Sequence, residues 1–273
     1  MNGRELGIRL RSGQRVYSTH IVSPSPVWPD AVKTTGIDFV FIDTEHVPID
    51  RTTLAWMCRT YRALGLCPVV RIPAPDPYQA TMAMDAGAEG ILAPYVETAD
   101  EVRRLSGAVK FRPLKGQRLD RALAGEPLEP ELARYIVERN AGHVLLVNIE
   151  SVPAIESLDA MLAVPGLDAV QIGPHDLSAS LGVPEQYAHP RFIEAVDHIV
   201  TQARAAGVGA GIHFWDSMEQ EIRWARLGAN LIMHSADTFL FARQLKTDIE
   251  RFRSELDGVQ DTRFCSIRET DSQ

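Results

Sequence analysis

The apolar positions of the chain fall into short runs, and longer stretches with helical spacing separate these runs. A short apolar run that ends at a turn signal is typical of a buried strand, whereas apolar residues three and four apart are typical of an amphipathic helix. The sequence therefore predicts strands at 15–22, 37–43, 67–72, 90–95, 143–150, 168–173, 207–214 and 230–235. It predicts helices at about 28–35, 51–64, 77–86, 98–108, 130–140, 152–162, 190–206, 216–227 and 238–256. Asp50 and Thr98 precede two of these helices and are of residue types that cap a helix N-terminus.

The regular alternation of strand and helix implies a parallel sheet with right-handed crossovers. About eight such units with apolar strands favour a closed (β/α)₈ TIM barrel over an open doubly wound sheet. A chain of 273 residues can form one such domain. We expect a single barrel over residues 1–256 and a polar tail, 257–273, that is disordered or packs on a neighbouring subunit. The stretch 110–130 is predicted to be a long irregular insertion, which usually serves as a lid or a subunit contact.

Composition excludes some classes of function but does not assign one. The net charge of −8 gives no general electrostatic case for binding nucleic acid or an anionic membrane. No run of 18 apolar residues occurs, and the first residues lack the apolar segment of a signal peptide. The three cysteines, Cys58, Cys67 and Cys265, lack the spacing of a metal knuckle and suit a reduced compartment. We therefore expect a cytoplasmic protein.

Ionisable side chains stand where the predicted strands end. In a (β/α)₈ barrel the chemistry belongs at the carboxyl ends of the strands. The residues found there are His20, Asp43, Glu45, His46, Arg71, Tyr95, Glu150, Asp176, His213, His234 and Asp237. Because several strands deliver such groups to the same rim, helix capping alone does not explain them, and the sequence predicts one shared site.

Two of these carboxylates are candidate metal ligands. Glu150 ends the apolar run VLLVNIE, and Asp176 ends the stretch VQIGPHD, which begins in the next predicted strand. Taken singly, Glu150 could be an acidic residue at a helix start, and Asp176 could cap a short turn. Together they indicate a hard divalent cation, Mg²⁺ or Mn²⁺, which fills its other positions with water and substrate oxygens. The ligands that zinc usually requires are not evident.

Arg71 and His46 are candidates for the reaction itself. Arg71 ends the run PVVRIP, where a buried guanidinium requires an anionic partner. It either forms a structural ion pair with Asp43 or Glu150, or it holds a substrate carboxylate or enolate oxygen. His46 is either a hydrogen-bonding residue at a helix start or a general base. No lysine ends a predicted strand, so a Schiff-base mechanism is close to excluded.

Four stretches carry a resemblance to a known family. FIDTEH, VVRIPAPDPYQATMAMDAGAEGILAPYVETADEVRR, VNIESVPAIE and DAVQIGPHDLSASLGVPEQYAHP resemble the HpcH/HpaI class II aldolases. The resemblance covers about residues 15–250, and the GPxDLS block after a strand that ends in IE is specific. It implies a metal-dependent enzyme that cleaves a 4-hydroxy-2-oxo acid to pyruvate and an aldehyde. It also implies a (β/α)₈ barrel that exchanges its last helix between subunits, usually in a hexamer.

The resemblance assigns roles to individual residues. Glu150 and Asp176 match the metal ligands of the family, Arg71 its substrate-contacting arginine, and His46 its catalytic histidine. Asp85 matches the aspartate that orients this histidine. Asp43 and the neighbouring Glu45 are expected to hold the site residues in place without contacting the substrate themselves. The residues expected to line the substrate are Asn148, Gly173, Pro174 and His175.

The chain also departs from the family pattern. Thr44 stands where the family has glycine, and Asn148 where it has glutamine. His20 replaces a tryptophan, and His175 is added beside the metal. Lys115 and Gly116 are the possible counterparts of a glycine-rich loop. These changes alter the residues that line the pocket more than those expected to hold the metal and the enolate. The resemblance therefore indicates the reaction class more firmly than the substrate.

The expected function is therefore that of a class II aldolase that uses pyruvate or a close 2-oxo acid such as hydroxypyruvate. Mg²⁺ or Mn²⁺ is the expected cofactor, Co²⁺ is also compatible, and the expected assembly is a homo-oligomer, a hexamer or a trimer. One alternative is an acyl-CoA lyase similar to the β subunit of citrate lyase, which would require a basic groove. The other is a catalytically silent barrel that binds a metabolite.

Overall fold

Eight parallel strands form a closed barrel. The computed structural model describes residues 1–257, so the polar tail from residue 258 onward and Cys265 lie outside the described residues. Each strand pairs with the next along the chain, and the eighth pairs with the first. The strands are β1 (Val16–Ile21), β2 (Phe39–Asp43), β3 (Cys67–Arg71), β4 (Gly90–Ala93), β5 (Val144–Ile149), β6 (Ala169–Ile172), β7 (Gly209–Phe214) and β8 (Leu231–Ala236). The predicted (β/α)₈ barrel is confirmed.

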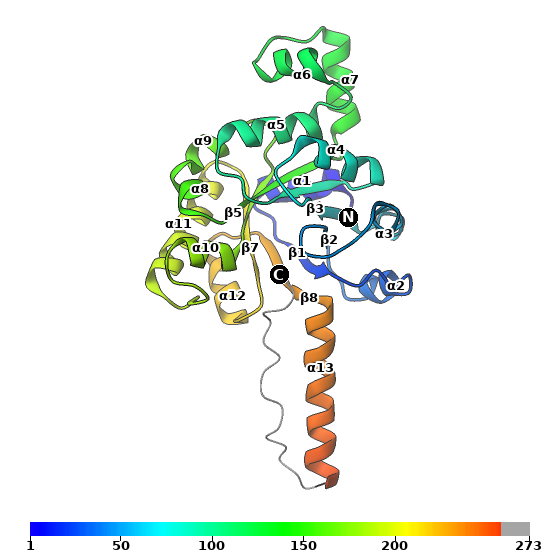
Figure 1. Cartoon of the computed structure of the whole chain (residues 1–273), viewed down its shortest axis with the longest axis vertical. Coiled ribbons are helices and arrows are strands. Elements are labelled where there is room, and N and C mark those ends of the chain that lie inside the picture. Colours follow the sequence, from blue (N-terminus) through cyan, green and yellow to red (C-terminus); the bar gives the residue numbers. More distant parts are fainter. Residues whose placement is uncertain (258–273) are drawn as a thin grey trace.

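Helices surround this barrel (Figure 1). In the first half of the chain they are α1 (Gly3–Ser12), α2 (Trp28–Lys33), α3 (Arg51–Ala63), α4 (Pro77–Ala86), α5 (Ala99–Lys110), α6 (Gly116–Leu123) and α7 (Pro130–Asn140). In the second half they are α8 (Val152–Glu156), α9 (Leu158–Leu162), α10 (Pro174–Ser180), α11 (Pro190–Ala205), α12 (Met218–Leu227) and α13 (Asp237–Phe252), which a π-helical turn (Arg253–Asp257) extends. Within residues 1–257, none of these helices has the length and apolar character needed to cross a membrane.

The predicted start signals hold, but α1, α6 and α10 were not predicted, and the helix predicted at 152–162 is divided into α8 and α9. The Asp50 side chain caps α3, and Thr98 forms a capping box with Glu101 at the start of α5. The stretch 110–130 is not wholly irregular, because α6 lies within it and packs Leu119 and Leu123 over Gly107 of α5. The leucine spacing of this short helix is easily overlooked in a segment rich in Pro, Gly and Arg.

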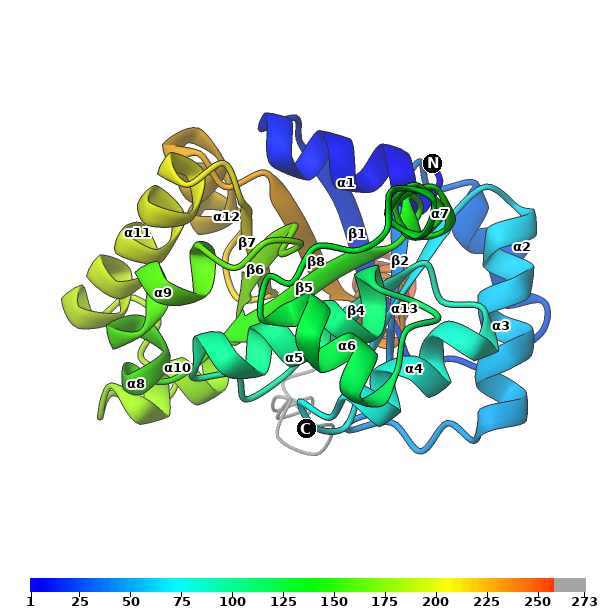
Figure 2. The ribbon, with the colours of Figure 1, turned by 90° about the horizontal axis from the view of Figure 1, so that it is seen from above.

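Helix α1 was missed at the sequence level, although its start carries a recognisable signal. Asn2 and Glu5 form a capping box, and Gly13 ends the helix in the left-handed conformation. Leu6 and Leu10 of α1 pack among the apolar residues of the barrel interior. Helix α1 therefore closes the end of the barrel where the strands begin (Figure 2).

Two parts of the chain extend away from the barrel (Figure 1). Helices α6 and α7 form one projection, and α13 runs outward alone on another side of the molecule. Among the residues of α13 only Asp237 is buried, so this helix does not cover the barrel of its own chain. The carboxyl ends of the strands lie opposite the end of the barrel that α1 closes. They are therefore the place where inward-pointing side chains can contact a ligand.

Candidate active site

The barrel interior ends in a polar layer. Side chains of a strand alternate between its two faces, so every second residue points inward. The inward positions are apolar in the middle of the barrel and polar at the carboxyl ends of seven strands, where they carry His20, Asp43, Arg71, Asn148, Gln171, His213 and Ser235. A cavity of about 90 Å³ lies over this layer, and its lining includes His20, His46, Arg71, Glu150, Gln171, Gly173, Pro174, His175, Asp176, His213 and Ser235. The structure thus brings most of the predicted site residues together.

Arg71 is held by two carboxylates, one at the end of the neighbouring strand β2 and one in the loop that follows it. Its Nε and Nη2 atoms donate to Oδ1 and Oδ2 of Asp43 at 2.8 and 2.7 Å, and Nε lies 3.1 Å from Oε2 of Glu45. Burial alone would raise the pKa of Asp43, but the hydrogen bonds and charge of Arg71 outweigh it and lower the pKa to about 2. The predicted ion pair therefore exists. Within the described residues Nη1 of Arg71 makes no hydrogen bond, so this group remains for an anionic ligand of the cavity.

His46 lies in the loop between β2 and α3 and does not cap that helix. Asp50 accepts from the backbone of Thr52 and Thr53 and so supplies the cap. The imidazole Nε2 of His46 lies 3.6 Å from Oε2 of Glu45, and 28% of the side chain is exposed. The helix-start explanation for His46 is therefore wrong, and its ring lies beside Glu45 at the edge of the cavity.

Glu150 is a buried carboxylate at the end of β5. Its Oε1 accepts from the backbone N–H of Tyr95 at 2.7 Å, and its Oε2 accepts from Nδ2 of Asn148 at 2.8 Å. Burial raises the pKa of Glu150 to about 7, and the nearby charge of Asp176 acts in the same direction. Ser151, not Glu150, caps the following helix α8. Glu150 is therefore not explained by capping.

Asp176 and Gly173 complete this side of the cavity. Asp176 stands in the first turn of α10 and is exposed, while Gly173 occupies the cap position. A Cβ atom at Gly173 would overlap Oε2 of Glu150, so the glycine leaves the space that this carboxylate occupies. His175, beside Asp176, lies 3.6 Å from Glu185 and belongs to the same wall.

The donor set fits a hard divalent cation. Oδ1 of Asn148 and Oε1 of Gln171 are buried acceptors without a hydrogen-bonding partner in the described part of the chain. Together with Glu150 and Asp176 they offer oxygen atoms only, as Mg²⁺ and Mn²⁺ prefer. Over residues 1–257 no group of three His, Cys, Asp or Glu side chains could hold a metal. Two carboxylates would thus leave the remaining positions to water and substrate.

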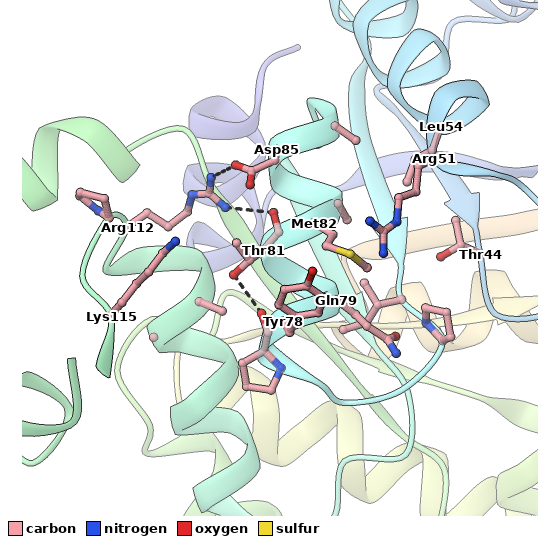
Figure 3. A pocket seen from close by; sticks show the side chains of 18 of the residues that line it. Thr44, Arg51, Leu54, Tyr78, Gln79, Thr81, Met82, Asp85, Arg112 and Lys115 are labelled. Atoms are coloured by element: carbon pink, nitrogen blue, oxygen red, sulfur yellow. Dashed lines mark hydrogen bonds and ion pairs between the residues drawn. The ribbon is translucent and has the colours of Figure 1, made fainter. Parts of the chain in front are cut away.

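Asp85 lies elsewhere. It stands on the last turn of α4, forms an ion pair with Arg112 and lines a separate cavity of about 950 Å³ between α3, α4 and α5 (Figure 3). Its side chain is 67% exposed. Within one chain Asp85 therefore does not orient His46, because α4 presents it to the outer helices and not to the strand ends.

Some residues of the site were not singled out at the sequence level. Gln171 stands among apolar residues in β6, and this polar residue at an inward position was the available signal. Tyr95 was predicted at a strand end, but its backbone contact with Glu150 was not, because it needs a φ of 53° that few residues other than glycine adopt. Its N–H reaches Glu150 because the chain turns sharply after β4, and no pattern of side chains reveals such a turn.

The fold and the cavity define a class of protein, namely a (β/α)₈-barrel enzyme whose cavity at the strand ends contains an arginine and two carboxylates suited to a cation. Within this class the chain belongs to the HpcH/HpaI aldolase/citrate lyase family, which it matches over residues 20–243. It is a carbon–carbon lyase, as the resemblance at the sequence level implied.

Curated relatives and solved structures agree with this assignment. The 2-keto-3-deoxy-L-rhamnonate aldolase of Salmonella gallinarum (strain 287/91 / NCTC 13346) is 32% identical over 247 residues, which are 90% of this chain and 91% of the relative. A family protein from Burkholderia cenocepacia J2315 is 29% identical with a TM-score of 0.79, covering 92% of this chain and 100% of that one. The citrate synthase SbnG is 28% identical with a TM-score of 0.79, covering 92% and 98%.

Proposed function

We propose that this aldolase cleaves a 4-hydroxy-2-oxo acid to pyruvate, or a close 2-oxo acid such as hydroxypyruvate, and an aldehyde at the cavity over the polar layer. The observation that carries the proposal is the position of Arg71. Its guanidinium is fixed by Asp43, while Nη1 has no hydrogen bond from residues 1–257 and lies at a cavity that Glu150 and Asp176 also line. A 2-oxo acid offers a carboxylate and a keto oxygen, which match this combination of donor and cation site.

Arg71 stabilises the negative charge that develops in the reaction. When the C3–C4 bond breaks, its electron pair moves into the enolate of pyruvate. A divalent cation held by Glu150 and Asp176, either Mg²⁺ or Mn²⁺ with Co²⁺ also compatible, would supply Lewis-acid stabilisation of the same charge. The guanidinium requires no reorientation during this step, because Asp43 and Glu45 already hold it.

His46 acts as the general base in this proposal. It removes the proton from the 4-hydroxyl group as the carbon–carbon bond breaks, so the aldehyde leaves with a carbonyl group. The enolate then takes up a proton at C3 and becomes pyruvate. The imidazole Nε2 of His46 lies 3.6 Å from Oε2 of Glu45, so this carboxylate is placed beside the base.

A panel of 4-hydroxy-2-oxo acids assayed for pyruvate release tests the proposal, with exchange of the pyruvate methyl protons as a second readout. Release from at least one member, together with exchange, is the expected outcome. Protein that binds the cation and pyruvate but never exchanges these protons would instead be a silent metabolite-binding barrel.

A second candidate is an acyl-CoA lyase, because the larger cavity is basic. Its lining includes Arg51, Arg112, Lys115 and Arg139, which suit the phosphates of coenzyme A (Figure 3). Of these, Arg112 is already paired with Asp85. Acyl-CoA thioesters in the same substrate panel distinguish this function, since an aldolase leaves them intact.

Replacement of Arg71 by lysine is expected to recover little activity. A lysine ammonium is a point charge and cannot bind Asp43 through two parallel bonds while it offers a third nitrogen to the substrate. We expect kcat to fall by roughly 10² or more, on the scale of losing one preorganised donor to a developing charge. Steady-state pyruvate release measures the effect, and near-normal kinetics would make Arg71 only a structural ion-pair partner.

We further propose that α13 is exchanged between the subunits of a homo-oligomer, a hexamer or a trimer. An exposed apolar stripe runs along α13 and the turn beyond it: Phe241, Leu245, Ile249, Phe252 and Leu256. An apolar groove beside β1 and β8 lies open on the same chain, and its lining includes the exposed residues Tyr17, Met218 and Ile222. An unpartnered stripe and an uncovered groove on one chain complement each other when two copies meet.

The double variant L245E/I249E is therefore expected to dissociate the oligomer, because two charges would be buried without partners. Sedimentation of the variant should give a smaller species than the parent protein. The variant K246E, on the polar face of α13, serves as the matched control. An unchanged mass in L245E/I249E, or a parent protein that is already monomeric, would exclude the exchange.

A further inference from the structure

A further cavity, called here the arginine cavity, lies near the start of β5. Its volume is about 470 Å³, and five separate segments of the chain line it: α3, α4, the segment after α5, α7 and the residue before β5. The lining consists of Arg62, Met84, Arg112, Arg139 and His143. None of these residues also lines the cavity over the polar layer. Because His143 directly precedes β5, the arginine cavity lies toward the end of the barrel where the strands begin.

The lining of the arginine cavity is strongly basic. Three of its five described residues are arginines and none is acidic, in a protein whose net charge is −8. Burial lowers the pKa of His143, and the charges of Arg112, Lys110 and Arg139 act in the same direction, against the hydrogen bond to Val109. The imidazole therefore experiences a positive potential, and such a potential attracts anions.

Helix capping does not use the guanidinium groups of Arg62 and Arg139. Both residues stand in the last turn of a helix, α3 and α7 respectively, where a positive charge favours the helix dipole. Within residues 1–257, however, neither donates to a backbone carbonyl. Arg62 has only an ion pair with Glu89 at 3.8 Å, and Arg139 donates only to the hydroxyl group of Tyr135 at 3.2 Å. Most of their N–H groups are therefore available to a ligand.

Arg112 is the fixed member of the three arginines. Its Nη1 donates to the backbone oxygen of Thr81 at 3.2 Å, and its Nη2 forms an ion pair with Asp85 (Figure 3). Its Nε makes no hydrogen bond to the part of the chain that the structure describes. Asp85 offsets the charge of Arg112, so Arg62 and Arg139 are the arginines that would contribute most to binding an anion.

We propose that the arginine cavity binds the phosphate group of a small phosphate ester, at a site separate from the aldolase site. A guanidinium group binds phosphate through two parallel N–H···O bonds, and arginines from different helices can hold different oxygen atoms of one phosphate group. Met84, which is buried on α4, offers an apolar contact to the carbon atoms of the ester. A volume of about 470 Å³ is within the range of small-molecule sites and leaves room for this organic part.

Calorimetric titration of the full-length protein with glycerol 3-phosphate tests the inference. We expect binding, and we expect R62Q and R139Q each to weaken it roughly tenfold, because each removes charge-assisted hydrogen bonds to the phosphate group. Both arginines are exposed, so the variants should keep the thermal stability of the parent protein. Glycerol, which lacks the phosphate group, should not bind. Absence of binding of glycerol 3-phosphate to the wild type would overturn the inference.

Each variant has a matched control on its own helix. Arg51 is an exposed arginine of α3 that lines the cavity of about 950 Å³ but not the arginine cavity. Arg134 is an exposed arginine of α7 that lines neither. R51Q and R134Q should therefore bind glycerol 3-phosphate as the wild type does. An equal loss of affinity in R51Q and R62Q would indicate a general effect of surface charge and would refute a site at the arginine cavity.

Two further titrations separate this site from other sources of anion binding. Saturating pyruvate and Mn²⁺ should leave the affinity for glycerol 3-phosphate unchanged, because the arginine cavity shares no lining residue with the cavity that contains Arg71. Loss of binding under these conditions would assign the anion to Arg71 and overturn the inference. Inorganic phosphate should bind more weakly than the ester, since it makes no contact with Met84. Equal affinities would contradict the assignment of an organic ligand.

Discussion

The variant H46A should lose roughly 10²- to 10⁴-fold in kcat, which is the usual range for removal of a general base. Its fold should survive, because the bond from residue 46 to Asp43 comes from the backbone N–H and is retained in alanine. Asp50 continues to cap α3, so no helix end is exposed. Pyruvate release and thermal unfolding, measured on the same preparation, test both statements.

The control for this variant is H198A, since His198 is an exposed histidine of α11 that lies outside the cavity. H198A should match the wild type in both measurements. A variant H46A that melts earlier but turns over normally per folded molecule would remove His46 from the mechanism. Another group at the cavity would then have to be the base.

The variant E150Q should weaken the binding of Mn²⁺ by roughly two orders of magnitude, because affinity for hard cations depends on the charge of the ligand set. The amide is nearly isosteric with the carboxylate, and its own burial is less costly than that of an ionised group. The metal-free variant should therefore keep its fold. Calorimetric titration with Mn²⁺, alongside circular dichroism of the metal-free protein, measures both effects.

E156Q provides the matched control, because Glu156 is exposed on the neighbouring helix α8. The variant D176N should behave like E150Q if the two carboxylates share one cation. Unchanged Mn²⁺ affinity in both E150Q and D176N would contradict a site built on these residues.

The sequence predicted the site well where its residues depend on the regular geometry of the strands. The short apolar runs placed Asp43 and Arg71 at strand ends, and their pairing across β2 and β3 follows from the register of a parallel barrel. Glu150 and Asp176 follow adjacent strands and meet for the same reason. These contacts depend on the backbone of the barrel more than on the details of packing.

The site could not be predicted where the position of a group depends on the rotation of a helix about its axis or on the path of a loop. Asp85 lies on α4, and its distance from His46 depends on the face that this helix turns toward α5 and Arg112. The backbone of Tyr95 reaches Glu150 only because a non-glycine residue adopts a positive φ. Helix α13 runs away from the barrel and buries only Asp237 among its residues, and no local pattern of its sequence reveals this direction.

The close contact of Gly173 with Glu150 has a consequence for how this barrel can evolve. Because any side chain at position 173 would displace Oε2 of Glu150, the two positions cannot change independently. A shorter carboxylate at 150 would have to arise before, or together with, a larger residue at 173, and the reverse order would pass through an inactive intermediate. Laboratory evolution that begins from this sequence should therefore keep glycine at 173 in every active lineage that keeps glutamate at 150. Substitutions elsewhere in the cavity lining should not change this outcome.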